Sequence, residues 1–213
     1  MKTRTLVSFD WAIKRLLRNK ANFGILNGFL SELLKEEIVV QQVLESEGNQ
    51  EDAEDKFNRL DLLCKNQKEE LIIFEVQYYE DIDYFQRCLY STSKVITEYI
   101  SKGEPYSQVK KVYSINILYF DLGHGRDYIY IGRTNFVGLH DGDLLHLSEA
   151  QQVRFRKSAP HEIFPEYYLL KINNFDDVAK NSLDEWIYFL KNTELPHNYK
   201  AKGLSQVAEQ LKY

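Results

Sequence analysis

The apolar positions along the chain follow two different spacings, which predict a mixture of helices and strands. A spacing of three and four residues, typical of amphipathic helices, occurs in residues 8–19, 23–37, 83–103 and 182–192. Runs of β-branched and aromatic residues instead predict strands. These runs occupy residues 35–45, 56–65, 70–78, 110–125, 127–140 and 166–175, and shorter helices are expected at 148–155 and from Leu204 onwards.

The order of these segments predicts how the strands pair and which fold class they form. A turn-like KNQKEE joins 56–65 to 70–78, so these two strands are expected to form an antiparallel hairpin. The strand 127–140 is expected to be the antiparallel neighbour of 110–125. Helices, two strands, a helix and then more strands predict a mixed α/β fold, not a regular βαβ series. In the helix 83–103, the expected buried stripe consists of Phe85, Leu89, Val95, Ile96, Tyr99 and Ile100.

One predicted strand, LIIFEVQYY at Leu71–Tyr79, carries polar residues inside an apolar run. Side chains alternate along a strand, so Phe74 and Val76 point to one face, while Glu75 and Gln77 point to the other. A carboxylate and an amide therefore stand side by side on one face of a strand that otherwise reads as core. This pair is the first candidate for a functional site.

Composition predicts one folded domain of ordinary size with a substantial core. The chain has 213 residues, of which 44% are hydrophobic and 14% aromatic, and this excludes a disordered protein. Cys64 and Cys88 form no close CxxC pair, so a disulfide framework is not expected and a reducing cytoplasm fits best. No apolar run approaches the roughly 20 residues of a membrane span, and no signal peptide opens the chain. A soluble cytoplasmic protein is expected.

Charge is unevenly distributed along the chain. The net charge of −5 argues against a partner as acidic as nucleic acid. However, residues 1–40 hold seven Lys or Arg against four Asp or Glu, and residues 84–120 hold five against two. Residues 45–55 hold six acids and no base. Two basic regions thus leave room for a polyanionic partner that the overall charge conceals.

Asp61 and Glu75 are the candidate metal ligands. They lie on the two strands of the expected hairpin, which would bring their carboxylates together. Two adjacent buried carboxylates repel each other, and a divalent cation removes that cost. Carboxylates, a backbone carbonyl and water are ligands that suit Mg²⁺ or Mn²⁺. The alternative is that both carboxylates face solvent and pair with a lysine such as Lys65, because the D-x13-E-x-Q pattern alone is weak.

A longer array of segments resembles a known family. In order along residues 8–195, it reads FDWAIKRLL, ILNGFLSELL, EDKFNRLDLLCKNQKEELIIFEVQ, DYFQRCLYSTSKVITEYISKGEPYSQVKKVYSINILYFDL and LDEWIYFLKN. This array resembles the recombination-promoting nuclease and putative transposase family, which belongs to the PD-(D/E)XK nuclease superfamily. The resemblance implies a restriction-endonuclease-like core, in which helices flank a mixed central β-sheet. It also implies Mg²⁺-dependent cleavage of DNA phosphodiesters in recombination or mobile-element biology.

The resemblance assigns roles to individual positions. Asp61 matches the first catalytic aspartate of the family, and Glu75 matches the acidic residue of the (D/E)XK triplet. Gln77 falls where the superfamily more often has lysine, although this family commonly has E-x-Q. An amide only donates and accepts hydrogen bonds, so Gln77 would position water or phosphate without adding charge. Val76 would contribute its main-chain carbonyl to the metal.

The chain departs from the superfamily pattern on an early helix. Superfamily members often place a glutamate there to complete the acidic cluster, and Asn27 stands near that position. An amide is a neutral and weaker ligand. Glu32 lies five residues further on, about 140° around the helix, and is a poor substitute.

Four basic residues are candidates for DNA contact. Lys14 lies in a basic stretch of the first predicted helix, and Lys56 matches a frequently basic family position shortly before Asp61. Arg87 and Lys94 lie on the polar side of the helix that follows the catalytic strand, which the resemblance places beside the site. Lys14, Arg87 and Lys94 are expected to contact the phosphate backbone, and Lys56 is expected to pair with Asp61 or with the substrate. A solvated basic surface is the alternative role of such residues.

The sequence thus leads to a metal-dependent DNA endonuclease with Mg²⁺, or Mn²⁺, as cofactor. The rival interpretation is a nuclease fold that binds DNA or protein without cutting, and a third is a structural interaction protein. A homodimer is expected, because many nucleases pair two active sites to cut both strands. Residues 1–195 are expected to form the nuclease-like domain. Residues 196–213 would begin a helical tail that is short or truncated relative to the family.

Overall fold

The computed structural model describes residues 23–44 and 61–210 of the chain. Lys14, Lys56 and the helix predicted at 8–19 lie outside the described residues. Within them, six strands form one sheet in the order β1-β2-β3-β4-β6-β5. The strands are β1 (Val40–Leu44), β2 (Leu62–Asn66), β3 (Leu71–Gln77), β4 (Val112–Leu118), β5 (Ile129–Gly132) and β6 (Glu166–Lys171).

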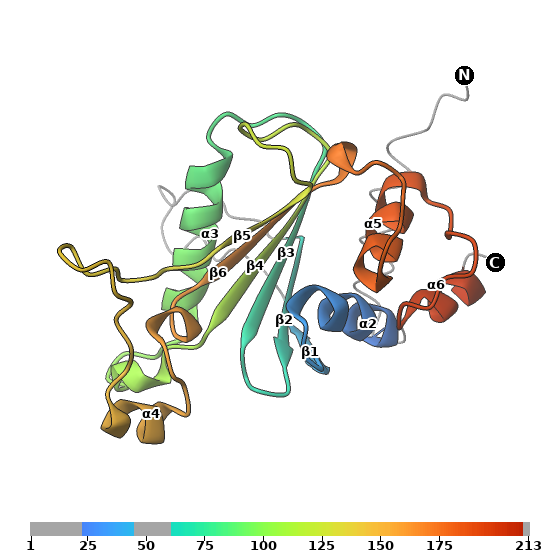
Figure 1. Ribbon diagram of the computed structural model, residues 1–213. Coiled ribbons are helices and arrows are strands. Elements are labelled where there is room, and N and C mark those ends of the chain that lie inside the picture. The colour runs from blue at the N-terminus through green and yellow to red at the C-terminus, as the bar shows by residue number, and fades with distance from the viewer. Residues whose placement is uncertain (1–22, 45–60, 211–213) are drawn as a thin grey trace, which may run out of the picture.

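The sheet is mixed, as the sequence predicts. β1, β2 and β3 run antiparallel in succession, so the hairpin between β2 and β3 is confirmed. β3, β4 and β6 are parallel neighbours, and β5 pairs antiparallel with the outer side of β6. Parallel strands need both faces covered by helices. Figure 1 shows this arrangement, with helices on each side of the twisted sheet.

The expected pairing of 127–140 with 110–125 is wrong. β4 lies between β3 and β6 and is parallel to both, whereas β5 pairs only with β6 at the edge. The burial of the two strands explains the difference. β4 is almost entirely buried, as a central strand must be, while β5 is half-buried to exposed and belongs at an edge. Adjacency in sequence did not determine pairing here.

Five α-helices flank the sheet in the described part of the chain. They are α2 (Phe23–Leu34), α3 (Tyr84–Glu98), α4 (Glu149–Phe155), α5 (Ser182–Asn192) and α6 (Leu204–Gln210), with short 3-10 helices at Tyr106–Gln108, Pro160–Glu162 and Ile172–Asn174. α2, α5 and α6 lie on one side of the sheet, and α3 lies on the other (Figure 1). None of the described helices is long and apolar enough to cross a membrane.

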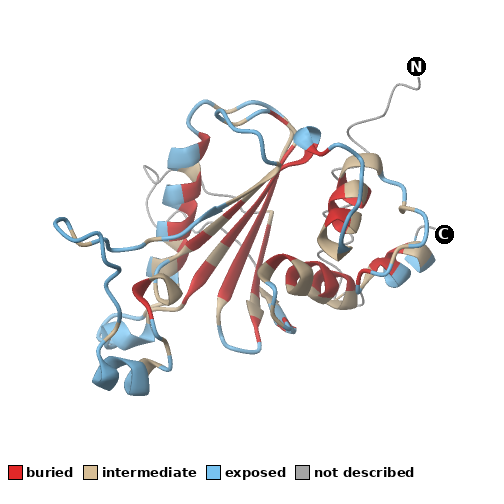
Figure 2. Cartoon of the chain, in the orientation of Figure 1, coloured by how far each residue is buried: buried red, intermediate tan, exposed pale blue. Residues whose placement is uncertain are grey.

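The two faces of β3 enter different cores. Phe74 and Val76 belong to the main core, together with side chains from α2, α5 and α6. Ile73 belongs to a smaller cluster that includes Val95 of α3. Because side chains alternate, Glu75 shares the face of Ile73 and points to the side that α3 covers. Figure 2 shows the central strands buried and the outer side of α3 exposed.

The second half of the expected stripe of α3 is confirmed, because Val95 is buried and Ile96 and Tyr99 pack against the same cluster. The first half is wrong. The buried residues are Tyr84, Cys88, Ser91, Thr92 and Val95, and this list shares only Val95 with the expectation. Phe85 and Leu89 are instead 54% and 61% exposed. The helix is turned so that polar and small side chains face the sheet, because the strands beneath it present buried polar groups that need hydrogen-bond partners.

The C-terminal segment packs against the main core. Ala201, Leu204 and Val207 are buried in the cluster that also contains Trp186 of α5 and Leu26 of α2. Helix α6 begins at Leu204, as the sequence predicts. The proposed domain boundary at residue 195 stays a prediction.

Candidate active site

The β2–β3 hairpin brings Asp61 against the end of β3. Leu62 pairs with Phe74, so the preceding residue, Asp61, lies level with Glu75. The Asp61 Oδ2 atom accepts a hydrogen bond from the backbone N–H of Val76 at 2.8 Å. Asp61 was expected inside a strand but lies in a bend directly before β2. Its carboxylate occupies the place on β3 where a further main-chain ladder bond would form.

Glu75 is a buried carboxylate on the α3 side of the sheet. Its exposed fraction is 5%, and its register partner on β4 is Asn116. The Arg87 Nη2 atom lies 3.5 Å from Glu75 Oε2. A buried carboxylate is costly without a cation, and Arg87 partly offsets that cost. The interpretation that Glu75 merely faces solvent is therefore wrong, and Lys65 pairs with Glu69 instead.

Val76 contributes its backbone to the site and its side chain to the core. The side chain is 5% exposed within the main core. Its N–H points to Asp61, and in a strand the N–H and C=O of one residue point to the same side. The Val76 carbonyl therefore lies on the side of β3 where Asp61 is held. A third oxygen is available beside the two carboxylates.

Gln77 ends β3 on the same face as Glu75. Its side chain is half-buried, and its Nε2 atom donates to the carbonyl of Tyr79 at 3.2 Å. Its own carbonyl accepts from the N–H of Tyr119 at 2.9 Å, which continues the pairing with β4. The amide is thus oriented along the chain at the strand end. Its expected contact with water or phosphate stays a prediction.

A buried polar network next to Glu75 was not foreseen from the sequence. The Asn116 Oδ1 atom accepts hydrogen bonds from Tyr84 Oη at 3.0 Å and from Cys88 Sγ at 3.3 Å. Its Nδ2 atom donates to the Tyr168 carbonyl at 3.2 Å. Burial, reinforced by the charge of Glu75, raises the pKa of Cys88 to about 12, so the thiol stays protonated and is not a nucleophile.

The sequence held one signal for this network. Asn116 interrupts the apolar run VYSINIL of β4, at a position that alternation places on the Glu75 face. A buried amide requires partners, and α3 supplies them through Tyr84 and Cys88. The network fixes the start of α3 against β4. This position is what allows Arg87 to reach Glu75.

Of the four predicted DNA contacts, two lie in the described residues. Arg87 is 38% exposed at its side chain, and its Nη1 atom also lies 3.8 Å from Asp81 Oδ2. Lys94 is half-buried, seven residues further along α3 and therefore on nearly the same side of the helix. The helix is beside the site, as the resemblance implied. The sequence did not predict that Arg87 would pair with Glu75.

Asn27 does not take part in this site. It lies on α2, which packs on the opposite face of the sheet from Glu75. Its Oδ1 atom accepts from the N–H of Val40 at 2.8 Å and so ties α2 to β1. Glu32, also on α2, lies 4.0 Å from Lys35. The expectation that Asn27 stands at the position of an acidic ligand is wrong, because α2 covers the other core.

The donor set fits a hard divalent cation. It consists of the carboxylates of Asp61 and Glu75 and the carbonyl of Val76, all of them oxygen ligands. In residues 23–44 and 61–210, no group of three or more His, Cys, Asp or Glu side chains is arranged to hold a metal. A cation here would complete its coordination with water, as Mg²⁺ commonly does. Zinc, which prefers nitrogen and sulfur, is a poor fit.

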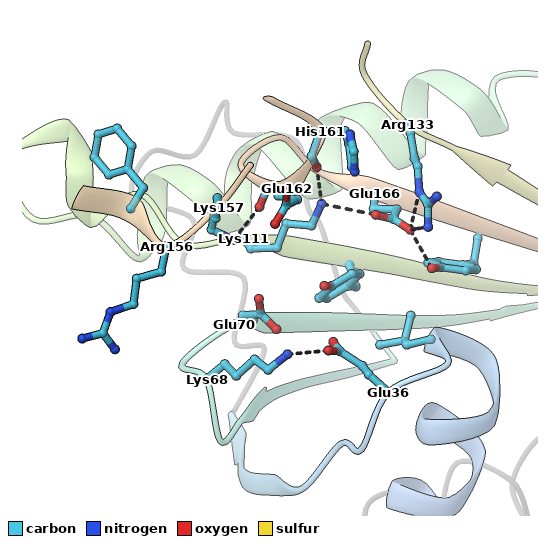
Figure 3. A pocket seen from close by; sticks show the side chains of 14 residues that line it. Glu36, Lys68, Glu70, Lys111, Arg133, Arg156, Lys157, His161, Glu162 and Glu166 are labelled. Carbon is cyan, nitrogen blue, oxygen red and sulfur yellow. Dashed lines mark hydrogen bonds and ion pairs between the residues drawn. The ribbon is translucent and has the colours of Figure 1, made fainter. Parts of the chain in front are cut away.

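A polar pocket of about 720 Å³ lies at the other end of the parallel strands. Glu166 lines it, and the Glu166 Oε1 atom accepts from Arg133 Nη2 at 2.8 Å and from Tyr168 Oη at 2.6 Å (Figure 3). Lys111 Nζ lies 3.4 Å from Glu166 Oε2 and donates to the carbonyls of His161 and Phe164, each at 2.7 Å. These charges satisfy one another and hold the β5–β6 connection to the sheet. We therefore assign this group of paired charges a structural role.

Comparison with known proteins agrees with this geometry. Residues 7–212 match the family model described as PD-(D/E)XK nuclease family transposase. No curated protein and no solved structure gives a significant match. The match covers nearly the whole chain, and the mixed sheet flanked by helices is the restriction-endonuclease-like arrangement of that superfamily. The chain therefore belongs to the PD-(D/E)XK nuclease family transposases.

Proposed function

We propose that the protein is a metal-dependent DNA endonuclease that hydrolyses phosphodiester bonds. The observation that carries the proposal is the hydrogen bond from Val76 N–H to Asp61, which holds one carboxylate against the strand that bears the buried Glu75. Mg²⁺ is the proposed cofactor, and Mn²⁺ would substitute for it. Family membership supports a setting in recombination or mobile elements.

In this proposal, the residues around the cation divide the work. Asp61, Glu75 and the Val76 carbonyl would hold the cation. When bound, a divalent cation lowers the pKa of a water molecule and offsets negative charge on the phosphate. The hydrogen bond from Val76 N–H occupies Asp61 Oδ2 and thereby orients the carboxylate. Gln77 would position the attacking water or the phosphate through its amide.

The DNA backbone would follow the side of α3 that carries Arg87 and Lys94. Arg87 lies beside Glu75, and Lys94 lies further along the same helix. Lys14 and Lys56 would add contacts from the segments outside the described residues. Contacts of this kind are independent of sequence and weaken as salt rises. They would fix the position of the duplex without selecting a base.

A second candidate is a nuclease fold that binds DNA or protein without cutting. Two observations favour it: Arg87 already pairs with Glu75, and Gln77 brings no charge to the site. In that case, the ion pair would be a permanent structural contact. The net charge of −5 also favours a protein partner over DNA.

Plasmid cleavage separates the two candidates. Supercoiled DNA is incubated with the purified protein in increasing Mg²⁺ or Mn²⁺, beside Asp61→Asn, Glu75→Gln and the exposed-acid control Glu80→Gln. The endonuclease proposal expects metal-dependent nicking or linearisation that falls at least about 100-fold in the first two variants, because a transition-state contact of this kind is typically worth that much. Glu80→Gln should cleave as the wild type does.

Other results would count against the proposal. Cleavage that survives in both Asp61→Asn and Glu75→Gln would place the active site elsewhere. A folded wild-type protein that binds DNA without cutting it in either metal would favour the second candidate.

The same preparation tests the proposed homodimer, because light scattering gives the mass of the protein in solution directly. A cytoplasmic location stays a prediction.

A further inference from the structure

Strand β3 brings no positive charge of its own to the site. The residue two positions after the strand glutamate is Gln77, whose amide cannot carry charge. The amide Nε2 atom is also engaged with the Tyr79 carbonyl. In phosphodiester hydrolysis, negative charge builds up on the phosphate oxygens, and a fixed cation beside them is among the largest catalytic contributions. The molecule must find that cation elsewhere or do without it.

Arg87 is the cation that α3 places at the site. Its Nη2 atom lies 3.5 Å from Glu75 Oε2, and its Nη1 atom lies 3.8 Å from Asp81 Oδ2. Two acids thus hold the guanidinium from two directions. Its side chain is 38% exposed, whereas that of Glu75 is 6% exposed, so the group bridges the buried carboxylate and solvent.

Buried hydrogen bonds, in addition to surface charge, determine the position of Arg87. The polar network of Tyr84, Cys88 and Asn116 anchors the first turns of α3 to β4. Asn116 is the register partner of Glu75, so the anchor and the carboxylate share one level of the sheet. Lys94 lies about 10 Å further along the helix axis and is too distant to take the same role.

We propose that Arg87 supplies, from α3, the fixed positive charge at the scissile phosphate that Gln77 cannot supply. This inference rests on the proposed endonuclease function. In the step, the oxygen of water bonds to phosphorus and the water gives up a proton to solvent. The bond to the 3′ oxygen breaks, and that oxygen takes a proton from solvent and leaves as a hydroxyl. Arg87 transfers no proton, because a guanidinium stays protonated in proteins. It stabilises the phosphate charge through its paired N–H donors.

The same geometry makes Arg87 a competitor of the cation for Glu75. A guanidinium 3.5 Å from Glu75 Oε2 repels a divalent ion that approaches the same carboxylate. Loss of Arg87 should therefore have opposite effects on two measurements. Metal binding should become tighter, while cleavage should become slower. A purely structural role for Arg87 would not produce this pair of opposite changes.

The test uses single-turnover cleavage of a labelled duplex at saturating protein, together with calorimetric titration of Mn²⁺ without DNA. Arg87→Met is compared with Lys102→Met, which removes one exposed positive charge outside the site. We expect Arg87→Met to slow cleavage about 100-fold and to tighten Mn²⁺ binding severalfold. Lys102→Met should leave both quantities unchanged.

A charge-replacement variant makes the test more specific. Adding Gln77→Lys to Arg87→Met returns a cation to the same site from β3. We expect the double variant to cleave at least about tenfold faster than Arg87→Met. If Arg87→Met does not fold, Arg87→Lys keeps the charge and should retain measurable cleavage. Restoration by Gln77→Lys would show that charge, and not packing, is what Arg87 provides.

The outcomes separate the inference from the function on which it rests. If the wild type cleaves and Arg87→Met cleaves equally fast, the inference is overturned and the endonuclease stands. If Arg87→Met is slow but Gln77→Lys restores nothing and Mn²⁺ affinity is unchanged, Arg87 acts on folding or DNA affinity and the inference is also overturned. If the wild type cleaves with neither metal, the endonuclease proposal fails and the inference fails with it.

Discussion

Single residues of the candidate site are held in different ways. Asp61 is fixed by one backbone donor, the N–H of Val76 at 2.8 Å. Glu75 is fixed by burial, with Arg87 at 3.5 Å as a cationic neighbour. A carboxylate held by a backbone group keeps its orientation whether or not a cation is bound. A buried carboxylate paired with a cationic side chain at 3.5 Å already has a positive partner, so an approaching divalent cation must compete with that partner.

The buried ion pair at the opposite end of the sheet allows a stability prediction. Burial alone would raise the pKa of Glu166, but hydrogen bonds from Arg133 and Tyr168 and the charge of Lys111 outweigh burial and lower it. Glu166→Gln leaves the buried Lys111 without its countercharge. We expect the free energy of unfolding at pH 7 to fall by about 3 kcal/mol, measured by urea denaturation.

The same variant has a defined pH dependence. A carboxyl group whose folded pKa is lowered stabilises the protein fully above its unfolded value of 4.5, and this contribution is lost as pH falls through the folded pKa. The stability difference between wild type and Glu166→Gln should therefore shrink as pH falls below that value. Lys180→Gln, which removes one partner of an exposed pair with Asp176, is the control and should change stability little at any pH. A difference that stays constant with pH would contradict the assignment.

Helices and strands could be predicted from the sequence where they bury apolar side chains. Prediction was less successful where polar groups are buried. The amphipathic pattern of 182–192 gave the bounds of α5, and alternation in Leu71–Tyr79 gave the two faces of β3. The orientation of α3 was not predictable in this way. Its apolar residues predicted a stripe through Phe85, whereas the buried Asn116 of β4 draws Tyr84 and Cys88 inwards. A pattern within one helix carries no information about polar groups on the strand beneath it.

The contact between α2 and the segment before α6 gives a prediction at the scale of elements. A Cβ atom on Gly28 would lie 2.1 Å from the backbone carbonyl oxygen of Lys202, so Gly28→Ala forces the two segments apart. Its effect on packing should exceed the gain in helix propensity of about 1 kcal/mol. We expect a lower melting temperature, measured by circular dichroism.

Gly24, one turn earlier on α2, is the matched control. The three atoms nearest to a Cβ atom there all belong to the side-chain amide of Gln206, with Oε1 at 2.2 Å, and a side chain can move away. Gly24→Ala should therefore be neutral or stabilising, because alanine favours the helix. Equal melting temperatures for Gly28→Ala and Gly24→Ala would contradict the close packing of α2 against the segment at Lys202.

At the scale of the molecule, the sheet separates an apolar face from the face that carries the candidate site. Figure 1 shows α2, α5 and α6 on one side of the sheet and α3 on the other. The first side is apolar, and the second carries Glu75 and the polar network. The candidate site lies at the carboxyl end of β3. The polar pocket that Glu166 lines, where charged side chains pair with one another, lies at the start of the same parallel strands. It is about 20 Å away from the candidate site along the strands.

The parts of the site that are close in sequence could be predicted, and the parts that depend on packing could not. Asp61 and Glu75 belong to one hairpin, so their proximity followed from the turn between them. Asn27 was misplaced because a sequence does not reveal which face of a sheet a helix covers. The pairing of Arg87 with Glu75 depends on the orientation of α3, which only the structure provides.

The central claim is that Asp61 and Glu75 form one divalent cation site. Calorimetric titration of Mn²⁺ into the DNA-free protein tests it most directly, using wild type, Asp61→Asn, Glu75→Gln and the control Glu80→Gln. We predict saturable binding that weakens at least about tenfold in Asp61→Asn and in Glu75→Gln and is unchanged in Glu80→Gln. Equal affinity in all four proteins, or no saturable binding by the folded wild type, would contradict the claim.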